Sequence, residues 1–189
     1  MVADLSPEDY TRALDVVFPV TPSRSDMIFK LSVRYRPSSG AESQVVLQQG
    51  AASTGEIDVA RTEGNVRSII NDALEMTSSI DPIGIARKVR VERVSLKVSA
   101  SRAFAIHAEF LRSWNETMTG LRQSAMREHR EGVTTVTLDG EAYEIWYQQG
   151  LLRIYGSFSA TDADTRTSAS AVTIGDWARR FRDEFAGRH

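Results

Sequence analysis

The sequence contains three histidines, whose side chains are the best suited to proton transfer near neutral pH, and no cysteine. A general acid or base needs a partner within hydrogen-bond reach, and the nearest carboxylate to His107, Glu109, would point to a different side of a helix. His129 lies in a charged run and His189 ends the chain. Without cysteine, neither a thiol nucleophile nor a thiolate zinc site is possible. We therefore interpret His107 as a partly buried packing residue.

Two aspartates, Asp162 and Asp164, could offer oxygen ligands to a hard cation. A calcium loop of the EF-hand type needs further acidic residues and a glycine at fixed spacing, and these are absent from the sequence. The sequence also lacks glycine-rich phosphate loops, a nucleophile elbow and a zinc-binding HExxH motif. We therefore expect no metal and no cofactor, and the sequence does not favour an enzyme.

The most basic stretch of the chain could contact phosphate groups if its residues shared one face of a strand. Its cations are Arg87, Lys88, Arg90, Arg93, Lys97 and Arg102. Interspersed charge of this kind more often marks a solvated strand whose charges discourage edge pairing. The formal net charge of −2 provides no global basic field, so nucleic acid is the less favoured partner.

Residues 133–158 predict three consecutive antiparallel strands. Asp139-Gly140 is typical of a two-residue hairpin turn, because both positions tolerate a positive φ, and it would pair Tyr143 with Val136. A second turn is expected at Gln149-Gly150. Both turns predict the same buried face, which would hold Val136, Leu138, Tyr143, Ile145, Tyr147, Leu152, Ile154 and Phe158.

The opposite face of this three-stranded meander is the strongest candidate for a binding site. In the predicted register Trp146 lies opposite Arg153, and Glu144 lies opposite Tyr155. An arginine stacked on a tryptophan contributes roughly 0.5–1 kcal/mol when exposed, and Trp, Tyr and Arg dominate the hot spots of protein interfaces. The alternative is that a helix of the same chain, the first or the last, covers this face.

A 3.5-residue apolar period predicts one long amphipathic helix over about 101–130. Such a helix lying across a curved sheet can leave an apolar pocket. His107, Trp114 and Tyr143 would line that pocket.

Cap signals mark a first and a last helix. Ser6-Pro7 is typical of a helix start, and Thr173 followed by Asp176 is a variant of the capping box. Between these helices, alternation with a period of two predicts strands over 26–36 and 44–49.

The segment 88–98 also alternates, but its apolar residues change phase near Glu92-Arg93. A β-bulge at that point would restore a single buried face. The alternative is a strand that is covered on both faces.

These elements predict an α+β fold with one or more mainly antiparallel sheets, the long helix, and a C-terminal three-stranded meander followed by a helix. A hydrophobic content of 41% is enough to build a core without metals or crosslinks. We expect a single domain over 1–189, in which two halves, 1–80 and 85–189, could share one core.

The sequence has neither a signal peptide nor an apolar run near the roughly 20 residues of a membrane span. We therefore expect a soluble cytoplasmic protein without a membrane partner. Its basic residues are nearly all arginine, which is most simply explained by a GC-rich bacterial genome.

We predict a non-catalytic protein-interaction module of the adaptor, secretion-chaperone or partner-neutralising kind. It would bind a protein partner, or a second copy of itself, through Glu144, Trp146, Arg153 and Tyr155. One alternative is a small-molecule-binding protein or an unrecognised enzyme that uses the pocket of the long helix. A second alternative is nucleic-acid binding through basic strands, with Arg34, Arg36, Arg87, Lys88 and Arg90 as contacts.

Overall fold

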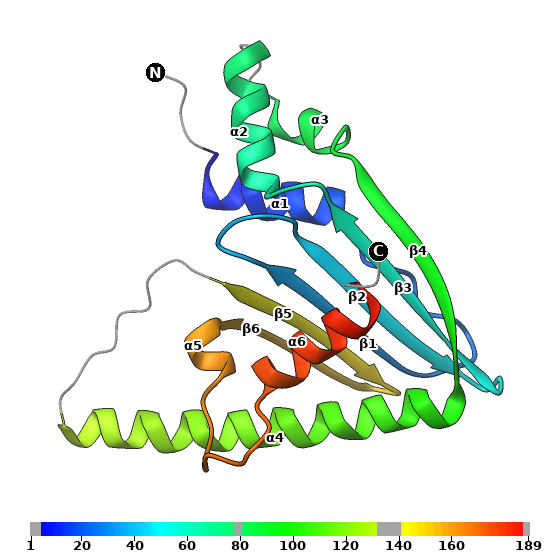
Figure 1. The fold of residues 1–189 in the computed structure, drawn as a ribbon, viewed down its shortest axis with the longest axis vertical. Coiled ribbons are helices and arrows are strands. Elements are labelled where there is room, and N and C mark those ends of the chain that lie inside the picture. Colours follow the sequence, from blue (N-terminus) through cyan, green and yellow to red (C-terminus); the bar gives the residue numbers. More distant parts are fainter. Residues whose placement is uncertain (1–4, 78–80, 132–140, 187–189) are drawn as a thin grey trace.

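The computed structural model describes residues 5–77, 81–131 and 141–186. Its strands form one six-stranded antiparallel sheet in the order β4-β3-β2-β1-β5-β6 (Figure 1). The strands are β1 (Met27–Arg36), β2 (Ser43–Gly50), β3 (Thr54–Thr62), β4 (Val91–Ser99), β5 (Ala142–Gln149) and β6 (Leu152–Ser159). The predicted α+β class with a mainly antiparallel sheet is confirmed, and strands from both ends of the chain share this sheet.

Helices precede, interrupt and follow the strands. In the described residues they are α1 (Pro7–Val17), α2 (Val66–Thr77), α3 (Pro82–Ala86), α4 (Ala100–Glu131), α5 (Ala160–Ala163) and α6 (Ile174–Phe185). The predicted long helix is confirmed as α4. The predicted caps are also confirmed, because Ser6 Oγ accepts from the Asp9 backbone nitrogen at 3.1 Å and Thr173 forms a capping box with Asp176.

One face of the sheet, here called the inner face, packs against α4 and α6 (Figure 1). The strands contribute fully buried residues such as Leu31, Leu47 and Ile145. Phe110 of α4 and Trp177 of α6 meet above them, with ring centroids 5.2 Å apart. Each large apolar side chain buried here contributes roughly 1.5–3 kcal/mol, so this core holds both helices on the sheet.

A second cluster of apolar residues lies where α1, α2 and α3 pack together beside β3 and β4 (Figure 1). Leu14 and Val17 of α1, Ile70 of α2 and Ala60 of β3 are buried in it. The predicted first helix, α1, therefore packs through an apolar side. This cluster covers one end of the face opposite to α4 and α6, which we call the outer face.

Strand β5 lies between β1 and β6, and both of its edges are occupied. Tyr143 lies opposite Tyr35 of β1 on one side and opposite Phe158 of β6 on the other. The predicted pairing of Tyr143 with Val136 is therefore wrong, and the strand predicted at 133–138 lies outside the described residues. The hairpin signal was local, whereas β1 offers β5 a long complementary edge that is remote in sequence.

The turn between β5 and β6 also differs from the prediction. It is formed by Gly150, with φ at +57°, and Leu151, so that Gln149 lies opposite Leu152. The register is shifted by two residues, and Trp146 lies opposite Tyr155 rather than Arg153. A shift by two residues keeps every side chain on its predicted face, because side chains in a strand alternate with a period of two.

The register between β3 and β4 is regular from Val91 to Ser99, so the predicted β-bulge near Glu92-Arg93 is wrong. The change of phase instead reflects the alternative, a strand that is covered on both faces. Val89 and Val91 pack into the cluster of α1, α2 and α3, whereas Val98 packs into the inner-face core. Apolar residues alternate in two phases here because the strand meets a different core on each face.

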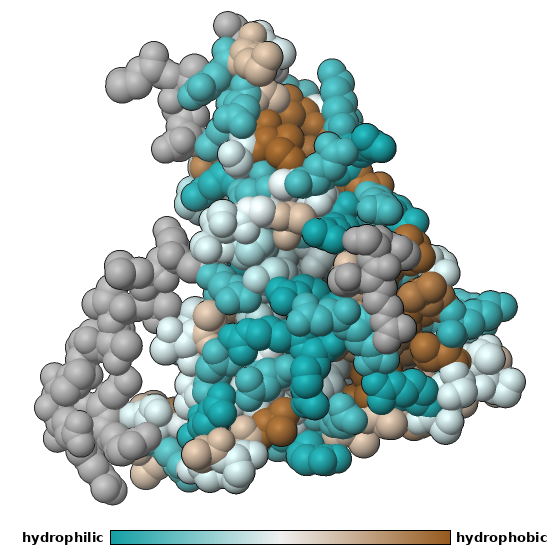
Figure 2. Space-filling model, viewed as in Figure 1, coloured by the Kyte–Doolittle hydropathy of each residue, from teal (hydrophilic) through white to brown (hydrophobic). Residues whose placement is uncertain are grey.

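Figure 2 shows the side of the molecule on which α6 lies. The surface over α6 is largely hydrophilic, and hydrophobic surface appears beside α2 and α3 and over the β3–β4 side of the sheet. Among the helices of the described ranges, none combines the length and the apolar composition that crossing a membrane requires.

Candidate functional site

The outer face of the sheet carries the aromatic and charged residues selected from the sequence. Glu144 and Trp146 lie on β5, and Arg153 and Tyr155 lie on β6. The rings of Trp146 and Tyr155 face each other with centroids 5.3 Å apart and an angle of 42° between their planes. Tyr155 is 59% exposed and Arg153 is also exposed, whereas Trp146 is half-buried. The two rings therefore form one aromatic patch that reaches solvent along β6.

Trp146 rests on a buried arginine that the sequence did not single out as its neighbour. The guanidinium carbon of Arg34 lies 5.0 Å from the Trp146 ring centroid and 5.8 Å from that of Phe18. Its side chain is only 1% exposed and donates to the Phe18 carbonyl oxygen at 3.0 Å. Arg34 thus joins the end of α1 to the aromatic patch and fixes the plane of the indole.

The carboxylate of Glu144 neutralises both Arg34 and Arg36. It accepts from Arg34 at 3.0 Å and forms an ion pair with Arg36 at 3.0 Å, and Arg34 also reaches Asp15 of α1 at 3.3 Å. Glu144 is 9% exposed, so its charge is committed within the chain. This network was not predictable from spacing, because positions 34 and 144 are brought together only by the β1–β5 pairing.

The segment 18–26, which connects α1 to β1 and is here called the strap, crosses the outer face. Three cations of the sheet hold the end of α1 and the beginning of the strap through backbone oxygens. Arg93 donates to Val17 at 2.9 Å, Arg34 donates to Phe18, and Lys30 donates to Thr21. The last carbonyls of a helix lack intrahelical partners and carry its negative dipole end, so cations stabilise them.

Beneath the strap lies a pocket of about 480 Å³ that opens beside the aromatic patch. Its lining residues are Val20, Thr21, Pro22, Ser23, Lys30, Ser32, Gln44, Trp146, Tyr147, Gln148, Arg153, Ile154 and Tyr155. The charged residues of this lining are Lys30 and Arg153, and both are positive. Sequence reasoning identified three of these residues, and it missed the pocket because the strap carries no recognisable motif.

Lys30 is the most unusual group in the pocket, because it is a cation with only 8% of its surface exposed. In the register it lies between Gln48 of β2 and Gln148 of β5, which are both neutral. Burial lowers the pKa of Lys30 below its ordinary value of 10.5. Within the described part of the chain, its ammonium group forms no ion pair.

Of the residues predicted to line a pocket under the long helix, His107 lies in the inner-face core. Its ring stacks on Phe29 with centroids 4.3 Å apart, and its Nε2 lies 2.7 Å from the Tyr147 hydroxyl. Because that hydroxyl donates to Gln149 at 2.5 Å, the histidine Nε2 carries the proton and donates. Burial lowers the pKa of His107, which therefore favours the neutral ring.

The other two predicted pocket residues lie elsewhere in the same core. Trp114 packs edge-on against Phe158 with centroids 5.4 Å apart. Tyr143 is fully buried, donates to Glu141 at 2.9 Å, and has its pKa raised by burial and by that carboxylate. Each of the three residues thus has close neighbours of its own, and the pocket under the strap lies on the opposite face of the sheet.

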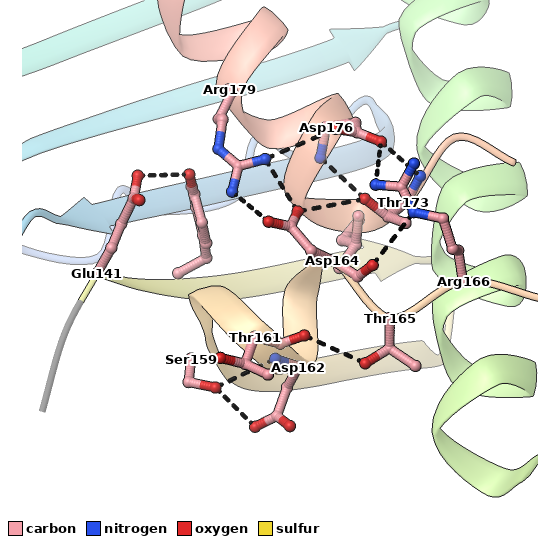
Figure 3. Close-up of polar contacts among 12 residues, drawn as sticks. Glu141, Ser159, Thr161, Asp162, Asp164, Thr165, Arg166, Thr173, Asp176 and Arg179 are labelled. Atoms are coloured by element: carbon pink, nitrogen blue, oxygen red, sulfur yellow. Dashed lines mark hydrogen bonds and ion pairs between the residues drawn. The ribbon is translucent and has the colours of Figure 1, made fainter. Parts of the chain in front are cut away.

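Asp162 and Asp164, the two aspartates considered as metal ligands and not favoured, lie in and after α5 (Figure 3). Asp164 accepts two hydrogen bonds from Arg179 of α6, at 2.9 and 2.6 Å, and Asp162 bonds the Ser159 hydroxyl at 2.9 Å. The Arg179 contact ties the end of α5 to α6, and the Ser159 hydroxyl caps α5 by accepting from the Asp162 backbone nitrogen at 3.2 Å. In the ranges that the structure describes, no group of three or more acidic or histidine side chains could hold a metal ion.

The basic stretch after α3 is partly used within the chain. Arg90 pairs with Glu63 at 3.0 Å and Arg102 pairs with Glu184 at 2.6 Å. Arg34 and Arg36, the other cations considered for nucleic acid, are held by Glu144. The five cations considered for nucleic acid therefore do not form one exposed basic surface.

Comparisons with known proteins give one match. The model of the family described as "Protein of unknown function (DUF3253)" matches residues 60–156, just over half of the chain. This range runs from the end of β3 to β6 and includes Trp146, Arg153 and Tyr155. No curated protein and no solved structure matches the chain.

Proposed function

We propose that this chain, which belongs to the DUF3253 family, is a non-catalytic protein-interaction module that binds its partner on the outer face of the sheet. The observation that carries the proposal is the aromatic patch of Trp146 and Tyr155, which reaches solvent beside Arg153. Residues of these three types supply most hot spots in protein interfaces.

The packing of the patch supports a binding role more than a core role. The strap and α1 cover Arg34, but they leave Tyr155 exposed at 59% of its surface. Arg34, which is bonded to Glu144, packs against the Trp146 ring, and this support would reduce the conformational entropy that Trp146 loses when a partner binds. The patch is thus preorganised, which favours affinity.

The chemistry of the pocket supports a non-catalytic role. Among the described residues that line it, there is neither a carboxylate nor an imidazole. Histidine, aspartate and glutamate are the commonest general acids and bases, so proton transfer in this pocket would have to come from Lys30 or from a tyrosine. His107 points into the inner-face core, where it stacks on Phe29, and is thus separated from the pocket by the sheet.

A second candidate function is the binding of a small molecule in the same pocket. Its volume of about 480 Å³ lies in the range typical of small-molecule sites, roughly 300–1,000 Å³. A thermal-shift screen would test this candidate, because a ligand that binds only the folded state raises the melting temperature by mass action. A metabolite that raises it in the wild type but not in a Trp146→Ala variant would support it.

Affinity capture with matched variants tests the protein-interaction proposal. Tyr155→Ala and Arg153→Glu change two exposed side chains, so the fold should be kept, and Met76→Ala removes an apolar side chain that is 87% exposed on α2. We expect a protein that is retained by the wild type and by Met76→Ala to be depleted about tenfold or more on Tyr155→Ala, as for the loss of an interface hot spot.

The same variants distinguish a foreign partner from a second copy of this chain. If the partner is a second copy, light scattering should give a dimer for the wild type and for Met76→Ala, and a monomer for Tyr155→Ala. Identical retained proteins and an identical mass for all variants, each with an unchanged melting temperature, would contradict the proposal.

A further inference from the structure

The cations on the outer face of β1 differ in whether a carboxylate of the described chain pairs with them. Arg34 and Arg36 are both paired with Glu144 at 3.0 Å. Lys30, four residues before Arg34 on the same face, is 8% exposed, and among the residues that the structure describes its ammonium group donates to the Thr21 carbonyl oxygen alone. A buried charge without a counter-charge is costly, whereas the same charge beside an anion is stabilised. Lys30 is thus the buried cation on this face of β1 that lacks a negative partner among the described residues, and an external anion would supply one.

The groups around Lys30 are arranged as hydrogen-bond donors. An ammonium group has three N–H donors, and Thr21 uses one of them. The Ser32 hydroxyl accepts from Gln44 Nε2 at 3.2 Å, so its own proton remains available for an acceptor in the pocket. These donors suit an anionic group with more than one acceptor oxygen, such as a carboxylate.

The walls of the pocket indicate what carries the carboxylate. Trp146 and Tyr155 form an apolar aromatic wall on one side, and Arg153 adds a second positive charge at the exposed rim. The strap residues Val20 and Pro22 add apolar surface on the other side. A carboxylate could therefore pair with Lys30, while an apolar side chain next to it contacts the aromatic and apolar residues of the pocket.

We infer that the pocket under the strap receives an acidic side chain of the partner, with its carboxylate against Lys30 and an adjoining apolar residue against Trp146 and Tyr155. This inference rests on the proposed function, because it names the chemistry that the partner brings to the outer face. Recognition of a single acidic group in a partly apolar pocket would give the interface its specificity, since a neutral isostere leaves the ammonium unpaired.

The test compares two synthetic peptides, acetyl-Ala-Phe-Glu-Leu-Ala-amide and its counterpart with Gln in place of Glu. Binding is followed by NMR through the indole N–H signal of Trp146, which is assigned with a Trp146→Phe variant. We expect the acidic peptide to shift this signal and to bind at least tenfold more tightly than the neutral peptide. The preference should disappear in Lys30→Met and persist in Lys97→Met, which changes an exposed lysine of β4.

Lys30→Met should fold, because methionine keeps the length of the buried stem and removes an unpaired charge. If it does not fold, Arg153→Glu gives the same readout, because reversing an exposed charge at the rim should abolish the preference for the acidic peptide. Equal binding of both peptides, or an unchanged preference in both variants, would overturn the inference. Tighter binding of inorganic phosphate than of acetate, or acetate binding as tightly as the acidic peptide, would also overturn it.

These outcomes are separate from those of the capture experiment. If Tyr155→Ala loses a partner but the two peptides bind equally, the proposed function stands. Only the inference that the partner inserts an acidic side chain is then overturned. A preference for the acidic peptide without any effect of Tyr155→Ala on retained proteins or on mass would overturn the proposed function.

Discussion

Arg34 is a charged side chain that is almost completely buried. It is 1% exposed, lies between the rings of Phe18 and Trp146, and is neutralised by Glu144. Buried ion pairs add little net stability when formed, because desolvation offsets their attraction, but removing one partner leaves a costly charge. The aromatic patch therefore depends on Arg34 for its geometry, although Arg34 itself is not accessible to a partner.

Replacing Arg34 with alanine should lower the free energy of unfolding by about 3 kcal/mol or more, because Glu144 loses its closest buried partner and Trp146 loses its support. Arg153→Ala is the matched control on the same face, and it should change stability by no more than about 0.5 kcal/mol since this side chain is exposed. Urea unfolding of both variants measures the difference. Equal stabilities would contradict the importance of the network.

His107 should make stability depend on pH in one direction. Burial lowers its pKa below the ordinary 6.5, so in the unfolded chain it binds a proton at a higher pH than in the folded chain. The stability it contributes is present above about pH 6.5 and is lost as pH falls from there through the lowered pKa. His107→Gln should therefore lose less stability than the wild type when urea unfolding is compared at about pH 7.5 and pH 5.

Gln keeps a donor for the Tyr147 hydroxyl, so the comparison isolates the proton. The carboxylates that titrate in this range are common to both proteins and cancel in the comparison. An identical loss of stability on acidification in both proteins would show that His107 is protonated equally in the folded and unfolded states.

At the residue scale, the composition of the exposed aromatic face was predictable. The alternation along β5 and β6 correctly grouped Trp146, Arg153 and Tyr155 on one face, because a register error of two residues leaves the faces unchanged. For Lys30 and Arg34, the alternation predicted their strand but not their burial. The sequence does not reveal that α1 and the strap return over that face, so their burial could not be read from the pattern.

At the scale of the elements, the first, the long and the last helix and two helix caps were predicted, and strand partners were not. A cap such as Thr173 with Asp176 is a contact over three residues, and the residues themselves specify it. The pairing of β1 with β5 joins segments about 110 residues apart, and no local signal competes with a nearby hairpin motif such as Asp139-Gly140. The same limit explains why the pocket under the strap was missed.

The contact between α4 and β6 depends on a glycine. A Cβ atom at Gly156 would lie 2.7 Å from the rings of both Trp114 and Phe158, which is closer than such atoms can approach. Gly156→Ala should therefore lower the free energy of unfolding by about 1–3 kcal/mol, as expected for overpacking of a core. Thermal or urea unfolding gives the measurement.

Gly64→Ala is the matched control, because the nearest side-chain atom would lie 3.8 Å from its Cβ. Its stability should be unchanged or slightly raised, since alanine reduces the entropy of the unfolded chain. A Gly156→Ala variant as stable as Gly64→Ala would mean that Trp114 and Phe158 can move apart freely.

At the scale of the whole molecule, the two faces of the sheet differ in how completely they are covered. The inner face is closed by α4 and α6 around an apolar core. The outer face is covered only in part, by α1, its neighbouring helices and the strap, and it keeps polar residues, a pocket and the aromatic patch. The α+β class followed from the predicted elements, whereas the division between the faces depends on strand order and was not predictable.

The central claim is that a protein partner docks on the outer face beside Tyr155. Photo-crosslinking tests it most directly, with p-benzoylphenylalanine in place of Tyr155, or of Met76 as the matched exposed control, in cells that produce the protein. We expect a discrete crosslinked species from position 155, either with another protein or with a second copy, and none from position 76. Crosslinks from position 76 alone, or none from position 155 while the protein is folded and abundant, would contradict the claim.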